Sequence, residues 1–267
     1  MCKPKEFIQC RNCPRLKQDG PKPGFYYEKI DGKDVVLECD CHKKWRLARL
    51  KEIKLTESGI TMDYTFNDYV GTKSLADLEC LKKIAKNPDK YSNKKMIYIW
   101  GPNGCQKTSM VQALGRELIE KNFSVQYTTM DNLITSLVSD FSRSESDNEK
   151  REYFLSKCMD CDFLIIDESF DLKKTHIYVS GYQVPYLDSF LRNRFDIGGR
   201  SIIFVSNVSP RNIADLPPSK PGEPQRPGFG ESIQNLVQRN VRESELIFRD
   251  VWVENVNSID RTALFNG

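Results

Sequence analysis

A glycine-rich turn between a short apolar run and a helical segment is the part of this sequence best suited to chemistry. Residues 97–109 read IYIWGPNGCQKTS. In such a turn backbone N–H groups converge on phosphate oxygens, and the N-terminus of the next helix adds partial positive charge. Lys107 would reach the β- and γ-phosphates of a triphosphate, and the Thr108 hydroxyl would ligate Mg²⁺. The predicted phosphate-binding residues are Gly101, Pro102, Asn103, Gly104, Cys105, Gln106, Lys107, Thr108 and Ser109.

Gln106 departs from the usual pattern G-x-x-x-x-G-K-[ST], which has a glycine at this position. A Cβ here must fit where the backbone passes close to phosphate, and glycine adds no bulk. Because Lys107, Thr108, the first glycine and the flanking strand and helix are retained, we interpret Gln106 as a tolerated or tuning variant. A degenerate loop that binds nothing is the alternative, and nucleotide-binding assays distinguish the two.

An acidic pair follows a second apolar run. The run FLII at 163–166 is typical of a strand buried on both faces, and it ends in Asp167 and Glu168. At the ligand-binding edge of a parallel sheet, such an aspartate holds Mg²⁺ and the adjacent glutamate orients and deprotonates the attacking water. A third buried run, IIFV, ends in Ser206 and Asn207. Asn207 would lie beside the γ-phosphate, although an ordinary asparagine between strand and loop has the same spacing.

The elements that must position these residues alternate along the chain. We expect strands at 96–100, 124–129, 163–166 and 201–206, with helices at 75–91, 109–122, 130–143, 184–199 and 231–244, and a last strand region from 245. Buried strands that alternate with helices indicate an α/β fold with a parallel, doubly wound sheet.

Four of the five cysteines in the first 41 residues predict a second, smaller domain. Asp31-Gly32 between two β-prone runs predicts a hairpin, and the period of two would place Cys39 and Cys41 on one face of its second strand. Both sulfurs could then turn toward Cys10 and Cys13, and four thiolates would form a structural Zn²⁺ site. His42 could replace one cysteine as a ligand, but on a continuing strand it would point to the opposite face. Free cysteines on a hairpin are the alternative.

Composition limits the remaining choices. The 267 residues allow one large α/β domain at 59–267 and a small zinc-binding domain with a basic helix at 1–58. Residues 1–58 hold 14 Lys and Arg against 9 Asp and Glu, which suits nucleic acid or an acidic protein surface, or equally a solvated charged face. Without a signal-like or membrane-spanning apolar run, we expect a cytoplasmic protein with no membrane partner.

Several stretches together resemble AAA+ helicase loaders of the DnaC/DnaI type, which are related to IstB-type ATPases. The resemblance extends from about Cys10 to Leu264. It is carried by TFNDY before the core, GPNGCQKT, FLIIDE, LRNRF, IIFVSN and NLVQRN, together with the cysteine-bearing N-terminal segment. The resemblance implies an ATPase with a P-loop AAA+ core and the cofactors ATP and Mg²⁺. A phage-type replication protein is compatible with the compact chain.

The resemblance also implies roles for individual residues. Lys107 and Thr108 become the phosphate and Mg²⁺ residues, Asp167 and Glu168 the Walker B pair, and Asn207 sensor 1. Arg239 matches the arginine finger that reaches a neighbouring subunit's ATP. Arg261 is the candidate for sensor 2, and Arg194 matches a recurrent arginine without an assigned role. An arginine finger in trans implies self-association through the ATP sites and slow hydrolysis by a monomer.

The implied partners are a hexameric replicative helicase, held by the N-terminal domain, and single-stranded DNA. We expect the DNA contact along Met130 to Arg143, tested by charge removal at Arg143 and Lys150. Two alternatives stay open. One is an IstB-type ATPase that regulates DNA transposition, which the cysteine-bearing head disfavours, and the other is a nucleotide-binding scaffold that never hydrolyses ATP, suggested by Gln106.

Overall fold

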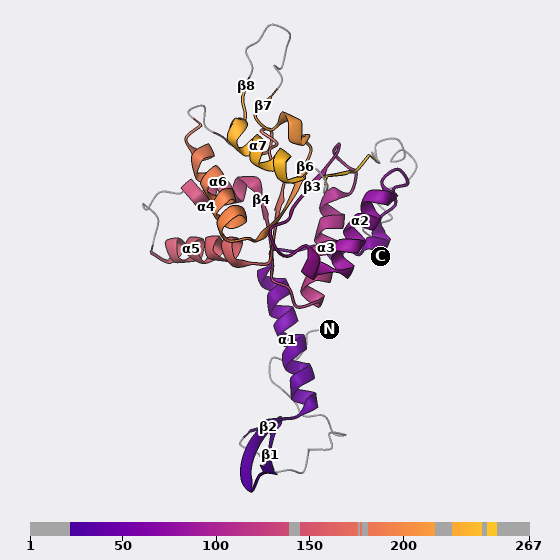
Figure 1. The fold of residues 1–267 in the computed structure, drawn as a ribbon, viewed down its shortest axis with the longest axis vertical. Helices are drawn as coiled ribbons and strands as arrows, with labels where there is room; N and C mark the ends of the chain where they lie inside the picture. Colours follow the sequence, from indigo (N-terminus) through magenta and orange to yellow (C-terminus); the bar gives the residue numbers. More distant parts are fainter. Residues whose placement is uncertain are drawn as a thin grey trace, which may run out of the picture. The chain divides into compact units, whose positions relative to one another are not determined.

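The computed structural model describes residues 22–138, 145–175, 177, 181–216, 226–241 and 245–249 (Figure 1). The chain divides into two compact units, Met1–Leu55 and Thr56–Gly267. Within the described ranges, no helix combines the length and the apolar character that crossing a membrane requires.

A β-hairpin begins the described part of the first unit. β1 (Phe25–Ile30) pairs antiparallel with β2 (Lys33–Glu38) across Asp31 and Gly32. Both turn residues have positive φ, 51° and 77°, which is the backbone conformation that a two-residue type I′ turn requires. The predicted hairpin is therefore confirmed.

The expectation that Cys39 and Cys41 share one face of a continuing strand is wrong. β2 ends one residue before Cys39, and Cys41 lies in the first turn of α1 (Asp40–Glu57). The helix begins here because the Cys39 sulfur accepts the backbone N–H of His42 at 3.4 Å, as the side chain of a helix-capping residue does. His42 accordingly lies on the helix. Cys10 and Cys13 lie outside the described residues.

Five parallel strands form the sheet of the second unit. Their order is β4-β5-β6-β3-β9. The strands are β3 (Met96–Trp100), β4 (Val125–Thr129), β5 (Phe163–Asp167), β6 (Ser201–Ser206) and β9 (Glu245–Ile247). Every residue of β5 and β6 is buried, which confirms the prediction of strands covered on both faces.

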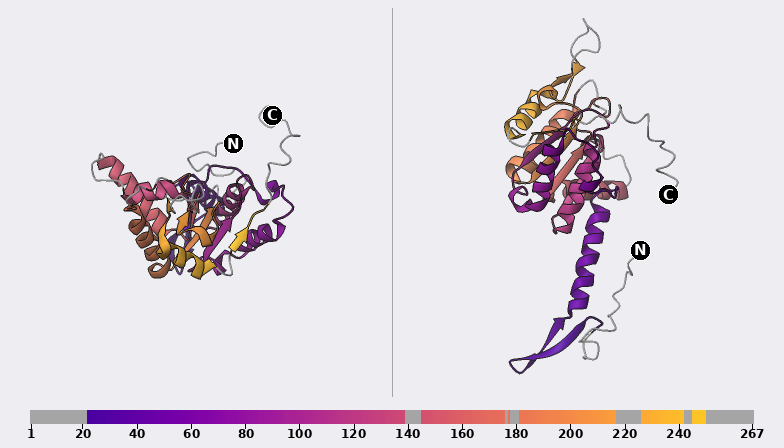
Figure 2. Two further views of the ribbon diagram at one scale, coloured as in Figure 1. Left: turned by 90° about the horizontal axis from the view of Figure 1, so that it is seen from above. Right: turned by 90° about the vertical axis from the view of Figure 1, so that its right-hand side faces the viewer.

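Helices cover both faces of this sheet (Figures 1 and 2). The helices on one face are α2 (Leu75–Lys86) and α3 (Lys107–Glu120), and those on the other are α4 (Met130–Val138), α5 (Glu145–Asp160), α6 (Gln183–Arg192) and α7 (Gly230–Val241). Shorter elements are η1 (Phe66–Asp68), η2 (Pro88–Lys90), the π-helical turn η3 (Asn193–Ile197), η4 (Pro210–Asn212), β7 (Asp215–Leu216) and β8 (Arg226–Pro227). The predicted α/β, doubly wound fold is confirmed.

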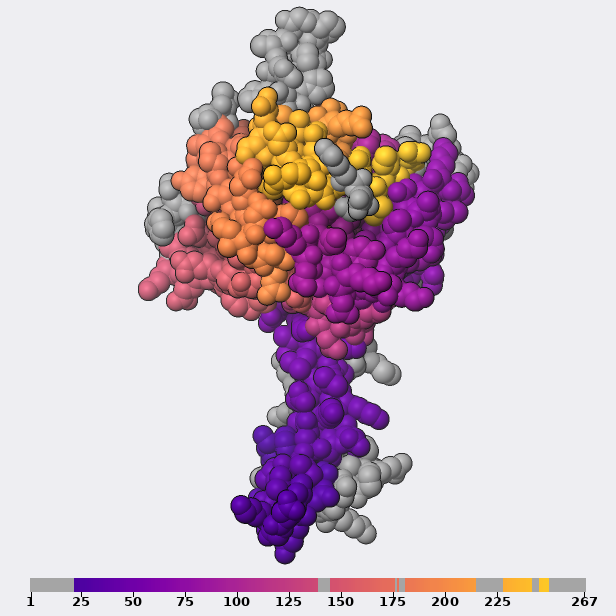
Figure 3. All heavy atoms as spheres, viewed as in Figure 1, coloured from indigo at the N-terminus to yellow at the C-terminus, as the bar shows by residue number. Residues whose placement is uncertain are grey.

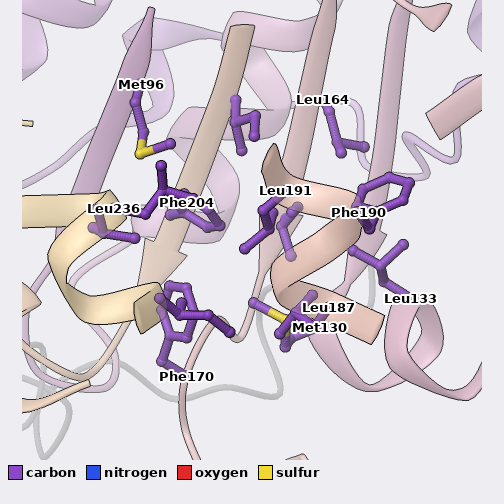
Figure 4. Close-up of a cluster of buried hydrophobic side chains, with 14 of the residues drawn as sticks. Met96, Met130, Leu133, Leu164, Phe170, Leu187, Phe190, Leu191, Phe204 and Leu236 are labelled. Carbon is purple, nitrogen blue, oxygen red and sulfur yellow. The ribbon is translucent and has the colours of Figure 1, made fainter. Parts of the chain in front are cut away.

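The core between the sheet and α4 to α7 follows from strand alternation. Met96 of β3, Leu164 of β5 and Phe204 of β6 point to this face, where they belong to one cluster with Leu191 of α6 (Figure 4). Tyr98 of β3 belongs to the same cluster. All five are at most 1% exposed. Burying one such apolar side chain stabilises the fold by roughly 1.5 to 3 kcal/mol, so this cluster holds the sheet rigid behind the site.

The order of the strands brings the predicted site residues together. β6 lies between β3 and β5, and parallel pairing places the carboxyl ends of all three strands at one edge. The loop that begins at Gly101 follows β3, Asn207 follows β6, and Asp167 ends β5. This adjacency of strand ends assembles the site.

β9 closes the other side of β3. The N–H of Ile247 donates to Asp77 at 3.2 Å, and the N–H of Arg249 donates to Ser74 at 2.7 Å, so the strand is fastened to α2 and its N-cap. Figure 3 shows the last coloured residues, in yellow, against the purple surface of α2. The carbonyl of Phe248 passes so close to Gly101 that a Cβ there would lie 1.9 Å from it. Only glycine fits at the start of the phosphate loop.

Candidate functional site

A pocket of about 660 Å³ opens where the loop after β3 meets the ends of β5 and β6. The residues that line it are Tyr64, Asn103, Gly104, Cys105, Gln106, Lys107, Thr108, Ser109, Asp167, Glu168, Lys174, Val205, Ser206 and Asn207. The structure thus brings seven of the nine predicted phosphate-binding residues to one pocket with the acidic pair and Asn207. Gly101 and Pro102 contribute backbone carbonyls behind it.

Lys107 is the buried cation of the pocket. Its ammonium donates to the carbonyl oxygens of Gly101 (2.9 Å) and Pro102 (2.7 Å) and to Oδ1 of Asn207 (3.0 Å). Burial lowers the pKa of Lys107, because desolvation disfavours the charged form. The N-terminus of α3 lies immediately beside it, so this end of the pocket suits a phosphate chain.

Asp167 is held by three donors. Its Oδ2 accepts the hydroxyls of Thr108 (2.8 Å) and Tyr127 (2.7 Å), and its Oδ1 accepts the N–H of Glu168 (2.7 Å). Asp167 is 4% exposed, so these bonds satisfy an otherwise costly buried carboxylate. The predicted pair of Mg²⁺ ligands, Thr108 and Asp167, is therefore adjacent, and hard oxygen ligands of this kind suit Mg²⁺.

Tyr127 was missed by the sequence prediction. Parallel pairing sets Tyr127 of β4 opposite Ile165 of β5, two residues before Asp167, and the hydroxyl reaches the carboxylate along the strand. Burial, followed by the charge of Asp167, raises the pKa of Tyr127, so it stays a neutral donor. The sequence does show a tyrosine in the strand that precedes the acidic one. Its contact with Asp167 could be predicted only once the order of the strands was known.

Replacing Tyr127 with phenylalanine is expected to lower the free energy of unfolding by about 1 to 2 kcal/mol, because a buried charge-assisted hydrogen bond is lost. Denaturant titration without nucleotide measures this. Tyr153→Phe is the matched control, because Tyr153 is 57% exposed and the bond from its hydroxyl to Glu57 is long, 3.4 Å. Equal stability of the two variants would show that the bond to Asp167 contributes nothing.

Glu168 forms an ion pair that the sequence did not predict. Lys174, in the turn after β5, donates to Oε1 of Glu168 at 2.7 Å, and both side chains are a little over one-third exposed. The hydrogen bond and charge of Glu168 raise the pKa of Lys174. Glu168 would therefore act as a base beside this ammonium, unless Lys174 moves onto a phosphate of the ligand.

Asn207 is oriented by two charged neighbours. Its Nδ2 donates to Asp171 at 3.0 Å while its Oδ1 accepts from Lys107. A carboxylate only accepts and an ammonium only donates, so the amide has one consistent orientation. Asp171 had no sequence signal, because its place depends on the turn of residues 168–175.

The remaining predicted residues do not meet in this pocket. Arg239 is exposed on α7 and lines a separate hollow with Arg192, Asn235, Leu236 and Gln238. Arg261 lies outside the described residues. Arg194 is fully buried and makes four hydrogen bonds to backbone carbonyls, so its place is in the framework.

Gln106 corrects the reason given for glycine at its position. Its φ is 61°, in the left-handed region that glycine adopts without strain. The side chain is held away from its own loop by hydrogen bonds to the backbone of Asp68 and Val70. This position thus requires a left-handed backbone conformation, and a glutamine whose side chain is held by hydrogen bonds also adopts it.

Comparison with known proteins agrees with this geometry. The profile of the family described as the bacterial DnaA ATPase domain matches residues 60–218. The chromosomal replication initiator protein DnaA of Borrelia turicatae is 30% identical over 187 residues, which are 69% of this chain and 34% of that protein. This chain spans about a third, 33% to 34%, of the length of the DnaA proteins of Helicobacter pylori and Helicobacter acinonychis, to which it is also similar.

Solved structures show the same fold at low sequence identity. The replication initiator DnaA bound to AMPPCP and single-stranded DNA has a TM-score of 0.51 and 16% identity, over 72% of this chain and 50% of that chain. The crystal structure of DnaI has a TM-score of 0.50 and 14% identity, over 70% and 90%. With more than half of its residues matched by one family profile, the chain belongs to the family of bacterial DnaA ATPase domains and is an ATPase with the AAA+ fold.

Proposed function

We propose that the protein is an ATP- and Mg²⁺-dependent loader that places a hexameric replicative helicase on single-stranded DNA during initiation of replication. The observation that carries this proposal is the pocket in which Lys107, the Thr108–Asp167 pair and Glu168 converge. The family is one of replication ATPases by its description and by its curated members. Helicase loading is the specific step that experiments must test.

Each pocket residue has a chemical role in this proposal. Lys107 leaves the carbonyls of the loop to bind the β- and γ-phosphates, because an anion is a stronger partner than a neutral carbonyl. Thr108 and Asp167 hold Mg²⁺, which neutralises phosphate charge when bound. Glu168 takes the proton of the attacking water, and Asn207 contacts the γ-phosphate region.

Arg239 is proposed to act on the ATP of a neighbouring subunit. It is exposed on α7 and does not line the pocket of its own chain, as a residue that works in trans would require. Wild-type specific activity should then rise with protein concentration, because active sites form between subunits. Arg239→Ala should abolish this rise, whereas Arg211→Ala, another exposed arginine, should retain it. A rise retained by Arg239→Ala would contradict a role in trans. Arg261 keeps its proposed sensor role without structural support.

Single-stranded DNA is proposed to bind along α4 and α5. Lys150 and Arg151 of α5 line a hollow of about 610 Å³ with Asn132 and Ser136 of α4. One structurally similar DnaA was solved with single-stranded DNA. Lys150→Gln should weaken oligonucleotide binding and reduce its salt dependence, measured by fluorescence anisotropy, and so should Arg143→Gln, at a position outside the described residues. Unchanged affinity and salt slope would count against this surface.

Zinc is proposed to stabilise the first unit through Cys10, Cys13, Cys39 and Cys41. Cys39 is 2% exposed, and its sulfur lies at the N-terminus of α1, where it accepts the backbone N–H of His42. In the described ranges no three potential metal ligands form a cluster. Cys10 and Cys13 lie outside those ranges. Elemental analysis should give one zinc per chain in the wild type and none in Cys39→Ser. A zinc-free wild-type protein would remove the site.

The first unit is proposed to hold the helicase. Its described helix, α1, is basic and has no buried residue, as a surface that binds another protein requires. The full chain, immobilised, should capture the replicative helicase encoded by the same genome, and Cys39→Ser should capture less. A wild-type protein that captures no helicase would overturn the loader proposal while leaving the ATPase intact.

A further inference from the structure

Gln106 ties the phosphate loop to a segment that precedes it by more than thirty residues in sequence. Its Oε1 accepts the N–H of Val70 at 3.0 Å, and its Nε2 donates to the carbonyl of Asp68 at 3.1 Å. The two partners fix the orientation of the amide, because Val70 N–H only donates and the Asp68 carbonyl only accepts. The glycine of the usual motif has no side chain for such a clamp.

The same segment is anchored at its other end by α3. Gln112, which is 2% exposed, accepts the N–H groups of Thr61 (3.2 Å) and Met62 (3.0 Å) through Oε1. Arg116 forms an ion pair with Asp63 at 2.7 Å. Residues 64–67 therefore lie between two attachments to α3 and its N-cap, and Gln106 provides the one next to the phosphate loop.

The clamped segment has a well-defined local structure. Oδ2 of Asp68 accepts both the N–H (2.7 Å) and the hydroxyl (2.8 Å) of Thr65, and the Thr65 hydroxyl oxygen accepts the N–H of Asn67 at 3.3 Å. These bonds form a capping box at η1. The position of Asp68 therefore also holds Thr65, and Tyr64 is the residue that precedes Thr65.

That preceding residue, Tyr64, lines the pocket. It is the aromatic side chain among the described lining residues, and it is 39% exposed. Lys107, Thr108 and Asp167 provide the polar groups suited to phosphates and Mg²⁺, and Tyr64 adds an aromatic ring to the lining of the same pocket. Such a ring offers a surface on which the nucleoside part of a bound nucleotide can pack.

We propose that Gln106 is a positioning residue that holds residues 64–70 as a preformed wall of the pocket, and that it thereby strengthens binding of the nucleoside part of ATP without acting on the phosphates. The proposal rests on the ATP site of the proposed function. A wall already in place costs less ordering entropy when nucleotide binds, which is how preorganisation adds affinity. The departure from the glycine motif is then a gain of contacts with a functional consequence.

Two variants and two ligands test the clamp. Gln106→Met keeps the length and the left-handed backbone but removes both hydrogen bonds, and Gln106→Gly removes the bonds together with the backbone strain. Both should weaken Mg²⁺–ATP binding by about 3- to 10-fold, as expected for two exposed neutral hydrogen bonds. Binding of Mg²⁺–tripolyphosphate, which lacks a nucleoside, should change less than about twofold. Titration calorimetry measures both ligands.

Hydrogen exchange reports the clamp itself. The Val70 amide should exchange faster in both variants, because its acceptor is gone. Gln238→Met is the matched control, since Gln238 on α7 also donates its side-chain amide to a backbone carbonyl but does not line the pocket. It should leave both affinities and Val70 exchange at wild-type values.

Three results would overturn the proposal. Equal weakening of ATP and tripolyphosphate would place the effect on the phosphate loop, and unchanged ATP affinity would show that the clamp is idle. Selective loss of ATP affinity with unchanged Val70 exchange would exclude this segment as the route. Failure of the ATP site itself is distinguished by the wild type, which would then bind neither ligand, and failure of helicase loading alters none of these titrations.

Discussion

Replacing Arg194 with methionine is expected to lower the free energy of unfolding by about 3 to 5 kcal/mol. The guanidinium donates to the carbonyls of Cys158 (2.8 Å), Met159 (2.7 Å), Cys161 (2.8 Å) and Ser201 (2.8 Å). Methionine fills part of the volume but leaves four buried acceptors without this donor. Such a loss is a large fraction of the 5 to 15 kcal/mol that stabilises a typical domain.

The position of Arg194 explains why an unpaired cation is tolerated there. Three of its carbonyl partners lie at or just beyond the C-terminal end of α5, where the helix dipole is negative, and the fourth belongs to the first residue of β6. Burial lowers the pKa of Arg194, yet a guanidinium stays charged far above neutral pH. Arg194 thus joins α5 to β6, the strand that Asn207 follows.

Arg200→Met is the matched control for this measurement. Arg200 forms an ion pair with Asp162 at 3.0 Å, and its side chain is 41% exposed, so its loss should cost about 1 kcal/mol or less. Urea unfolding of both variants gives the comparison. If Arg194→Met unfolds at the same urea concentration as Arg200→Met, the carbonyl cluster is not what holds α5 to the sheet.

The strands and the residues at their ends could be predicted because local patterns specify them. A buried parallel strand is a run of apolar residues, and polar residues directly after such runs identified Asp167, Glu168 and Asn207. Parallel topology then brings the strand ends together wherever the strands are neighbours. Their meeting in one pocket followed from the sequence with little further information.

The partners of those residues could not be predicted in the same way. Tyr127 reaches Asp167 because β4 pairs with β5 in one register, and Lys174 reaches Glu168 because the chain turns back after β5. Neither contact has a period or a fixed spacing in sequence. The prediction that the strand continues through Cys39 and Cys41 was wrong for a related reason. The Cys39 sulfur accepts an N–H of the first turn of α1, so the chain turns into a helix after Cys39.

Glu168→Gln is expected to reduce ATP turnover by about 10² to 10⁴-fold, since a positioned general base contributes that much to proton transfer. ATP affinity should remain within about threefold of wild type, because Lys107, Thr108 and Asp167, the residues proposed to hold the phosphates and Mg²⁺, are unchanged. The substitution keeps the shape of the side chain and removes its charge. Lys174 then loses its ion-pair partner but stays in the pocket lining, where it remains available to phosphate.

Turnover and calorimetric affinity measured on the same preparation separate chemistry from binding. Glu79→Gln is the control, because Glu79 is an exposed carboxylate on α2 that pairs with Lys82 outside the pocket. It should match the wild type in both measurements. If Glu168→Gln hydrolyses ATP at the wild-type rate, Glu168 is not the base. A wild-type protein without measurable turnover would favour the nucleotide-binding scaffold. A selective loss of turnover with affinity retained would instead show that Glu168 acts in the chemical step and not in binding. This is the result expected if Glu168 activates water while Asp167 holds the metal ion.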